Sequence, residues 1–193
     1  MKYNFFAYMA RMKLIRRWSL MKSVTDENIA EHSAQVAQIA HALALIKNKK
    51  FGGSLNADKI ASAALYHETS EVLTGDLPTP IKYYNPEIRR SYKDIESIAN
   101  EKLISMLPEE LRAEYRELIE LDADSYEGKL IKAADKISAY IKCIEEMRSG
   151  NREFAKAEAA LKKEVDFYRY LDEVAYFCDT FIDSFRKTLD ELE

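Results

Sequence analysis

Residues 27–49, with the sequence ENIAEHSAQVAQIAHALALIKNK, decide the fold class of this 193-residue chain. Their apolar positions recur every three or four residues, at Ile29, Val36, Ile39, Ala40, Leu43 and Ile46. Because an α-helix has 3.6 residues per turn, this spacing predicts one amphipathic helix with a single core-facing stripe. The following Gly52 and Gly53 end the segment, since adjacent glycines favour a break in a helix.

The same periodicity extends over most of the remaining chain. It predicts further helices over residues 4–20, 56–74, 86–106, 109–121, 126–148 and 151–189. No segment alternates apolar and polar residues as a half-buried strand would, and five glycines with four prolines leave few interruptions. The length suits one hydrophobic core without cross-links. We therefore expect an all-α protein whose single domain spans residues 1–193.

Charge and composition exclude several classes of function. A net charge of -4 without a basic face argues against DNA or RNA as a partner, because nucleic-acid binders must neutralise phosphates. A small phosphorylated ligand needs one or two cations and remains compatible. No apolar run is long enough to span a bilayer, and residues 1–20 lack the pattern of a signal peptide. With two isolated cysteines, Cys143 and Cys178, the sequence predicts a cytoplasmic protein with no membrane partner.

The chain has three histidines, and two of them occupy predicted core-facing positions. His32 lies on the apolar stripe of the helix quoted above, whereas His41 lies on its polar side. His67 shares a face with Glu71 in the next predicted helix, and Glu68 follows it directly. A single inward histidine is more often a hydrogen-bonded core residue than a ligand. Several buried ionisable groups together are costly unless they are paired or bind a cation, so this set predicts a site for Mn, Fe, Co, Ni or Zn.

Three further features have both a structural and a functional interpretation. Asp135 lies at the edge of an apolar stripe, where the alternative is a solvated acid paired with a neighbouring lysine. Arg17 and Trp18 end the first predicted helix, either as a boundary anchor or as a phosphate-binding guanidinium beside an aromatic platform. The loop Thr74–Pro80, TGDLPTP, is rigid because it contains two prolines and a glycine. It is either a plain connection or a binding loop.

Taken together, these residues resemble the HD-domain superfamily of metal-dependent phosphohydrolases, and most closely its bacterial 5′-deoxynucleotidases, the YfbR-like family. In that superfamily a His, a His-Asp doublet and a distant Asp bind one divalent metal inside a helical bundle. The resemblance covers nearly the whole chain. The segments that carry it are Arg17-Trp18, Glu31-His32-Ser33, Tyr66-His67-Glu68, Ser70–Pro80 (SEVLTGDLPTP) and Lys132-Ala133-Ala134-Asp135.

The resemblance implies a reaction and a set of residue roles. The reaction is hydrolysis of (deoxy)nucleoside 5′-monophosphates, with a preference for deoxyribose, to a nucleoside and phosphate. The implied ligands of one divalent transition metal (Co, Mn, Zn, Ni or Fe) are His32, His67, Glu68 and Asp135. The implied catalytic residues are Glu71, which moves a proton near the attacking water, and Arg17. The implied substrate-binding residues are Arg17, Trp18, His32, Glu68, Asp76, Leu77, Pro78, Thr79 and Asp135.

The metal-binding doublet departs from the superfamily pattern, because Glu68 stands where the superfamily has Asp. The extra methylene moves the carboxylate by about 1.5 Å along the side chain. We expect the helix or the rotamer to adjust so that the metal stays. The alternatives are a different preferred metal, or a weakened site in a non-catalytic nucleotide-binding protein.

Another HD phosphohydrolase activity, on a cyclic dinucleotide, an alarmone or a nucleoside triphosphate, is the alternative within enzymes. Extra phosphates require further cations, and the sequence singles out no clustered set. Arg17-Trp18 and the loop Thr74–Pro80 favour a monophosphate. The string HETSE at 67–71 resembles a zincin motif, but Glu71 replaces its second histidine, which argues against a metalloprotease.

Family members form homodimers, so the resemblance also implies a homodimer here. One candidate surface is the aromatic segment near the C-terminus, which contains Phe167, Tyr168, Tyr170, Tyr176, Phe177 and Phe181. The alternative, which we favour, is that these aromatic side chains pack within the core of one chain.

Overall fold

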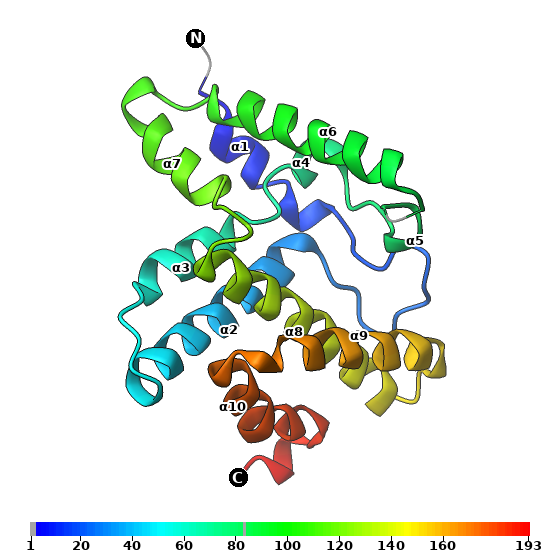
Figure 1. The fold of residues 1–193 in the computed structure, drawn as a ribbon. Helices are drawn as coiled ribbons and strands as arrows, with labels where there is room; N and C mark the ends of the chain where they lie inside the picture. Colours follow the sequence, from blue (N-terminus) through cyan, green and yellow to red (C-terminus); the bar gives the residue numbers. More distant parts are fainter. Residues whose placement is uncertain (1–2, 83) are drawn as a thin grey trace.

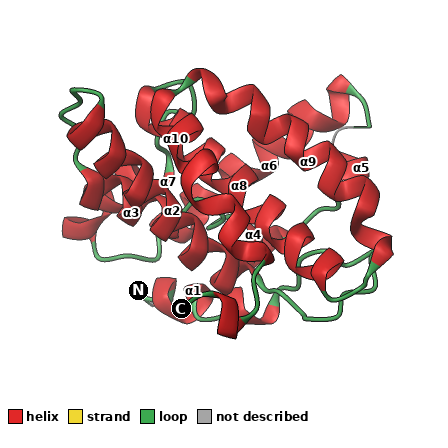
Figure 2. Ribbon diagram, turned by 90° about the horizontal axis from the view of Figure 1, so that it is seen from below, coloured by secondary structure: helices red, strands yellow, loops and turns green. Residues whose placement is uncertain are grey.

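The computed structural model describes residues 3–82 and 84–193, which form helices and turns joined by loops (Figures 1 and 2). Over these residues the structure contains one isolated antiparallel bridge, between Arg16 and Asn28, and no strand. In the same part of the chain no helix is long and apolar enough to cross a membrane. The prediction of an all-α protein is confirmed.

Two long helices, α2 (Ile29–Lys50) and α8 (Tyr126–Arg148), pack against each other at the centre of the molecule (Figure 1). The start of α2 is fixed by a capping box. The Asn28 side chain accepts hydrogen bonds from two first-turn N–H groups at 3.0 Å, and Glu31 accepts one from the Asn28 N–H. This cap holds the first turn of α2, on which His32 lies.

Three further helices complete the main core around this pair. Helix α3 (Ala57–Leu65) and helix α10 (Asp172–Phe181) pack on α2, and helix α9 (Ala155–Phe167) packs on α8. As predicted, Asn56 caps α3, and its side chain accepts a 2.9 Å hydrogen bond from the N–H of Lys59. The main core therefore surrounds the central pair with helices from both halves of the sequence.

A second, smaller core lies under helix α6, which crosses the N-terminal end of the molecule in Figure 1. It is formed by helices α1 (Phe5–Met9), α6 (Pro86–Ile104) and α7 (Arg112–Ile119). Its buried residues are Phe5, Leu103, Ile104, Leu107 and Ile119. The two short helices α4 (Glu71–Thr74) and α5 (Thr79–Lys82) lie between α3 and α6 in the chain. The segment from α3 to α5 thus runs from the main core to the second core.

The single helix predicted over residues 4–20 is wrong. Helix α1 ends at Met9, a 3-10 turn covers 12–14, and Arg16 then forms an isolated antiparallel bridge with Asn28, just before α2. The N–H of Arg17 donates to the Glu27 carbonyl, and the N–H of Ile29 donates to the Ile15 carbonyl, both at 3.0 Å. Because these backbone groups bond across the chain, they are not available to continue a helix.

The continuous helix predicted over residues 56–74 is also wrong, since α3 ends at Leu65. Two side chains take carbonyls that a longer helix would use. The hydroxyl of Thr69 donates to the Tyr66 carbonyl, and Nδ1 of His67 donates to the Ala64 carbonyl, both at 2.7 Å. Such local bonds compete with helical ones and turn residues 66–70 into an irregular segment.

The predicted helix over 151–189 is divided into α9, α10 and short 3-10 turns. Among the described residues, the 3-10 turns are Met12–Leu14, Glu109–Leu111, Arg152–Phe154, Tyr168–Tyr170, Ile182–Arg186 and Leu189–Glu191. Of the aromatic residues expected in the core, Phe177 is buried, but Phe167 is 71%, Tyr170 60% and Phe181 41% exposed. The prediction that this set packs inside one chain is therefore wrong for these three residues.

Candidate metal centre and its surroundings

His32 and Asp135 meet where α2 crosses α8. His32 is completely buried, as its position on the apolar stripe predicted. Its Nε2 lies 3.0 Å from Oδ1 of Asp135, and its Nδ1 lies 3.0 Å from Oγ of Ser138. Asp135 also pairs with Lys136 at 3.5 Å. The surface ion pair that the sequence left open as an alternative is therefore present, together with the inward contact to His32.

His67 reaches the same place from the irregular segment between α3 and α4. Its Nδ1 donates to the Ala64 carbonyl, which leaves Nε2 without a proton in the neutral ring. That Nε2 is buried and has no hydrogen-bond partner among the described residues. Its ring centroid lies 5.4 Å from that of His32. A buried nitrogen lone pair without a partner is costly, and a cation in the adjacent space satisfies it.

Four side chains converge around this nitrogen. His32, His67, Glu68 and Asp135 each offer one ligand atom, and these atoms all lie within 4.8 Å of one another. Two imidazole nitrogens with two carboxylate oxygens suit a divalent transition metal. The carboxylate of Glu68 belongs to this set despite its extra methylene. The donor set and the unpartnered His67 nitrogen therefore both fit a metal ion. We call these four side chains the metal cluster.

The pKa shifts of Asp135 and His32 favour metal binding. Burial alone would raise the pKa of Asp135, but the hydrogen bond with His32 and the charge of Lys136 hold that pKa well below its usual value. Burial and the nearby Arg17 lower the pKa of His32, so its ring is neutral. The charged carboxylate of Asp135 and the neutral imidazole of His32 are in the protonation states that metal ligands require.

Glu71 lies on the first turn of α4, buried beside Glu68. The two carboxyl groups share a hydrogen bond. Burial and the negative charge of Glu68 raise the pKa of Glu71 to about 10, whereas the pKa of Glu68 is lowered by His67 despite its burial. In the absence of a metal the pair therefore holds one proton, and that proton is on Glu71.

Arg17 and Trp18 lie in the irregular segment 15–27, which we call the strap, and not at the end of a helix. Nη1 of Arg17 and Nε1 of Trp18 both donate to Oε2 of Glu27 at 2.9 Å. Burial alone would lower the pKa of Arg17, but Glu27, Asp135 and other nearby carboxylates raise it. The guanidinium is 14% exposed and remains charged beside the metal cluster.

The backbone at Trp18 is strained. Its φ of 60° lies in the left-handed region, which costs a residue with a Cβ about 1–2 kcal/mol. The indole packs against Phe154 with ring centroids 5.3 Å apart, and the bond to Glu27 holds its other edge. These contacts stabilise a turn that places the guanidinium of Arg17 next to the metal cluster.

The far end of the strap is tied to α8 by Glu146, which is 1% exposed. Its carboxylate accepts hydrogen bonds from the N–H groups of Val24 at 2.8 Å and Thr25 at 3.1 Å. It also accepts from Nζ of Lys142 at 2.5 Å and from Nδ2 of Asn151 at 2.7 Å. These four bonds hold the pKa of Glu146 at about 2, although burial alone would raise it. The carboxylate therefore fixes the strap to the central helix.

The loop that follows α4 begins at Gly75, four residues after Glu71. Gly75 has a φ of 73°, which glycine adopts without strain, and Asp76, Leu77 and Pro78 follow in half-buried positions. Burial raises the pKa of Asp76. The charge of Arg17 lowers this pKa in part, and the charge of Glu68 raises it further. The loop thus brings Asp76 near the cluster. The side chain of Thr79, which was also predicted to bind substrate, lies outside the described residues.

The sequence did not single out three residues that the structure places at the site. Nζ of Lys82 donates to Oε1 of Glu96 at 2.9 Å and lies 4.7 Å from the Tyr92 ring centroid. The positive charge of Lys82 also lowers the pKa of Glu71 in part. Ser138 contacts His32, and Gln35 contacts Ser138. Ser138 follows Asp135 by three positions, and Gln35 follows His32 by three, which is the one signal that points to them.

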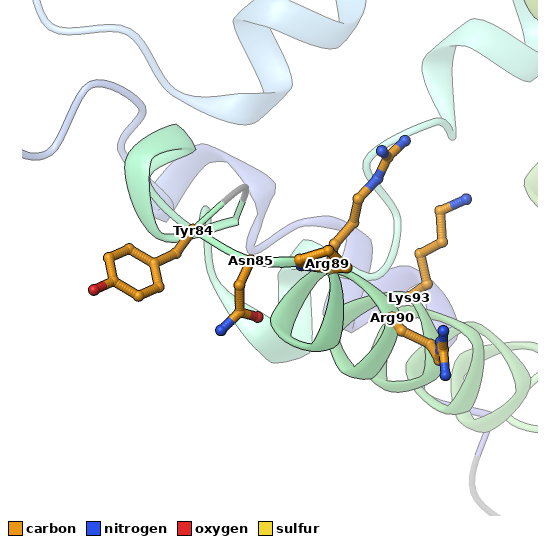
Figure 3. A pocket seen from close by; sticks show the side chains of 6 residues that line it. Tyr84, Asn85, Arg89, Arg90 and Lys93 are labelled. Carbon is orange, nitrogen blue, oxygen red and sulfur yellow. The ribbon is translucent and has the colours of Figure 1, made fainter.

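A group of cations surrounds a surface hollow at the start of α6 (Figure 3). Its lining is Tyr84, Asn85, Pro86, Arg89, Arg90 and Lys93. Figure 3 shows Arg89 and Lys93 extending from the same side of the helix. The expectation that further cations do not cluster is therefore wrong for this surface. None of the metal-cluster residues lines the hollow, so it adds no cation to the cluster itself.

Comparison with known sequences gives consistent matches along the chain. The family model described as 5′-deoxynucleotidase YfbR-like matches residues 4–185. A protein named 5′-deoxynucleotidase from Vibrio cholerae is 58% identical over 193 residues, covering 98% of this chain and 97% of the relative. Proteins of the same name from Photobacterium profundum and Pectobacterium atrosepticum are 54% and 53% identical, covering 99% and 98% of this chain and 98% and 95% of their own lengths.

Solved structures share the same helical arrangement. An HD-domain phosphohydrolase from Listeria innocua aligns with a TM-score of 0.83 and 25% identity, covering 95% of this chain and 88% of that protein. The HD phosphohydrolase of cyanophage S-2L, described as bound to dA and one catalytic Zn²⁺ ion, aligns with a TM-score of 0.67 over 92% of this chain and 96% of its own. At 19% identity the second likeness concerns the fold alone.

Proposed function

We propose that this chain, which belongs to the YfbR-like 5′-deoxynucleotidase family, is a metal-dependent phosphomonoesterase that hydrolyses nucleoside 5′-monophosphates. Its products are a nucleoside and inorganic phosphate, and deoxyribose is the preferred sugar. One observation carries the proposal: two histidines and two carboxylates gather within 4.8 Å beside a charged arginine. Relatives that share more than half of their residues with this chain are named 5′-deoxynucleotidases, which supports it.

The metal cluster is the proposed binding site of one divalent transition metal. Its ligands are His32, His67, Glu68 and Asp135, and Co, Mn, Zn, Ni and Fe all suit this mixture of nitrogen and oxygen donors. When bound there, the ion supplies positive charge that activates water and neutralises the phosphoryl oxygens. The Nδ1–H bond of His67 and the contact of His32 with Ser138 orient the two rings toward the ion.

Arg17 is the proposed phosphate-binding residue. Its guanidinium has a fixed planar fork that matches two phosphate oxygens, and it remains charged at all physiological pH values. Glu27 holds the guanidinium at 2.9 Å from the strap side, so its orientation is set before substrate binds. A preorganised cation stabilises the negative charge that develops on the phosphoryl oxygens in the transition state.

Glu71 is the proposed proton carrier. When the water oxygen attacks phosphorus, the bond from phosphorus to the 5′ oxygen breaks and that oxygen needs a proton. The carboxyl of Glu71 is buried next to Glu68 and faces the metal cluster through their shared hydrogen bond. A carboxyl in such a position can give its proton to the 5′ oxygen and later recover one from water.

The sugar and base are proposed to lie between Trp18 and the loop after α4. Asp76 offers a carboxylate to a ribose hydroxyl, and Leu77 and Pro78 present a proline-stiffened wall beside it. Close packing of such a wall against C2′ disfavours a 2′-hydroxyl without a dedicated contact. The indole of Trp18 supplies an aromatic surface for the base.

We expect the protein to be a homodimer in the cytoplasm, where nucleoside monophosphates are found. The exposed Phe167, Tyr170 and Phe181 are a candidate contact surface, because large exposed aromatics often mark protein interfaces. Light scattering of the purified protein measures the mass. Substituting Phe167 and Tyr170 by Ser should yield a monomer if this surface is the interface.

The central experiment combines metal analysis with a phosphate-release assay. Protein purified without chelator should contain about one divalent ion per chain. With Co, Mn or Mg added, it should release phosphate from deoxyribonucleoside 5′-monophosphates faster than from ribonucleoside 5′-monophosphates and from 3′-monophosphates.

The outcomes separate the alternatives. Release from no monophosphate with any metal contradicts the enzymatic proposal and favours a non-catalytic nucleotide-binding protein. Equal rates on ribose and deoxyribose substrates contradict the sugar preference alone. Faster release from a triphosphate or a cyclic dinucleotide favours another phosphohydrolase activity.

A further inference from the structure

We propose that Ser138, supported by Gln35, is a positioning residue that orients His32 for metal binding. The inference rests on the proposed metal cluster and concerns two residues that offer no ligand atom to it. Ser138 lies 3.0 Å from Nδ1 of His32, on the side of the ring opposite to Asp135. The ring is therefore held at both nitrogens.

The helical geometry explains why these residues meet. Gln35 follows His32 by three positions on α2, and Ser138 follows Asp135 by three positions on α8. Residues three apart lie on the same face of a helix, one turn along. At the crossing of the two helices, His32 thus faces Asp135 and Ser138, and Gln35 faces Ser138 with Oε1 at 2.6 Å from its hydroxyl.

The hydrogen-bond direction follows from the number of protons. A serine hydroxyl has one proton to donate and two lone pairs that accept. Ser138 donates its proton to Oε1 of Gln35, because a carbonyl oxygen can only accept. Toward His32 it then acts as an acceptor, so it stabilises the tautomer with the ring proton on Nδ1. That is the tautomer that metal binding selects, because Nε2, which lies 3.0 Å from Asp135 in the metal-free protein, then presents its lone pair to the ion.

His32 depends on this pair in a way that His67 does not. The Nδ1–H of His67 donates to a backbone carbonyl, that of Ala64, which no substitution removes. The Nδ1–H of His32 has a side chain as its acceptor. His32 and Ser138 are both completely buried, so no bulk water reaches them to replace a lost hydroxyl. Truncating Ser138 therefore leaves a buried N–H without an acceptor and lets the ring rotate.

The first test measures metal affinity without turnover. Apo-protein is titrated with Co²⁺, whose visible absorption reports the ligand geometry, and binding is measured in parallel by calorimetry. Ser138→Ala should weaken Co²⁺ binding by about 10- to 100-fold, the usual effect of removing the partner of a histidine ligand. Ser138→Thr keeps the hydroxyl and should restore binding to within about threefold of the original protein.

Ser33→Ala is the matched control. Ser33 is also a buried serine and is adjacent to His32 in sequence, but its hydroxyl has no partner among the described residues. Its removal should leave Co²⁺ affinity within about twofold. Equal affinities for Ser138→Ala and the original protein would overturn the inference while leaving the proposed function intact. If the original protein binds no divalent metal, the metal cluster and the inference both fail.

Gln35 provides a second variant that tests the direction of the bonds. Gln35→Glu keeps an oxygen acceptor and removes the amide donor, so Co²⁺ affinity should be retained or raised. Gln35→Met removes the acceptor and should weaken Co²⁺ binding by several-fold, less than Ser138→Ala. A loss in Gln35→Glu as large as in Gln35→Met means that Gln35 donates to Ser138, which overturns the proposed orientation of His32.

Discussion

The two halves of the candidate site are built in different ways. The helical half consists of His32 and Asp135, which lie on α2 and α8 and face each other because the two helices pack along apolar stripes. The turn half consists of Arg17, His67 and Glu68, which lie on irregular segments held by individual hydrogen bonds.

The difference teaches where each kind of damage should appear. A substitution in the helical half changes a buried position within a regular helix, and the metal should be lost with it. A substitution of Arg17 in the turn half, or of Glu71 beside it, leaves the four proposed ligands in place and should change turnover more than metal content.

Asp135→Ala should remove the metal itself. Asp135 contributes the carboxylate that faces His32, and its loss leaves one carboxylate in the cluster. We expect metal affinity to fall by more than about 100-fold, the upper end for residues that act only through a ligand. Phosphate release should become undetectable. Metal content after dialysis measures the effect, and Asp124→Ala, an exposed acid near the start of α8, should retain both metal and activity.

Glu71→Ala should separate turnover from metal binding. Glu71 is not in the metal cluster but lies against Glu68. Turnover should fall by about 10²–10⁴-fold, the usual contribution of a general acid or base, with metal content unchanged. Parallel measurement of kcat and bound metal checks this. Near-normal turnover would show that another group moves the proton. Glu87→Ala, an exposed acid on the first turn of α6, is the control.

Arg17→Lys should weaken catalysis while keeping the charge. Lysine offers a point charge in place of a planar fork, so one of the paired contacts to phosphate is lost. We expect kcat/KM to fall by about 10²–10³-fold, comparable to the loss of one preorganised donor, with metal retained. The adjacent Arg16 is an exposed residue paired with Asp26, and Arg16→Lys should change little. Equal losses of activity in both variants would show that a disturbed strap, and not the guanidinium of Arg17, causes the effect.

Glu146→Gln should loosen the strap and remove an acid-sensitive contribution to stability. The unfolded pKa of a glutamate is near 4.5, whereas Glu146 in the folded protein has a pKa of about 2. A lowered pKa stabilises the fold above pH 5, and this stabilisation, about 3 kcal/mol, is lost as the pH falls from 5 toward 2.

Urea unfolding between pH 7 and pH 3 tests this prediction. The variant should be less stable than the original protein at pH 7 by about 3 kcal/mol, because Lys142 loses its buried carboxylate partner and keeps only the bond to the Thr25 carbonyl. Its stability should depend less on pH below 5. The neighbouring Glu145 is exposed, and Glu145→Gln should show neither change. Equal acid sensitivity of all three proteins contradicts the role given to Glu146.

Glu68→Asp should have the smallest effect. The shorter side chain restores the residue that the superfamily has at this position. The segment 66–70 is irregular and can shift to bring the carboxylate into place. We expect metal content to be retained and phosphate release to be unchanged or raised. A complete loss of metal would show that the turn half is as rigid as the helical half.

The sequence predicted the helical half better than the turn half, and for a physical reason. Periodicity placed His32 in the core because the stripe of α2 continues without interruption for 22 residues. The same reasoning put His67 on a helical face, although α3 ends at Leu65. Two local side-chain bonds cause that end, and they depend on atomic geometry that spacing does not report.

Contacts between residues far apart in the chain also could not be predicted from periodicity. Periodicity alone gave Asp135 no inward role, because nothing local indicates that α8 crosses α2 at that turn. The resemblance to a family implied that Asp135 is a metal ligand. In the structure its Oδ1 lies 3.0 Å from Nε2 of His32. Ser138 and Lys82 were missed for the same reason, since their partners lie more than ten positions away in the chain.

The strap has a consequence for how this chain can vary. Its two backbone bonds, from Arg17 to Glu27 and from Ile29 to Ile15, involve no side-chain atoms. They fix the distance between the arginine and the first turn of α2 whatever residues occupy the exposed turn in between. Substitutions at Ser19 and Leu20, which are exposed, should therefore be neutral, and they can alter the surface of the protein without moving the arginine relative to His32.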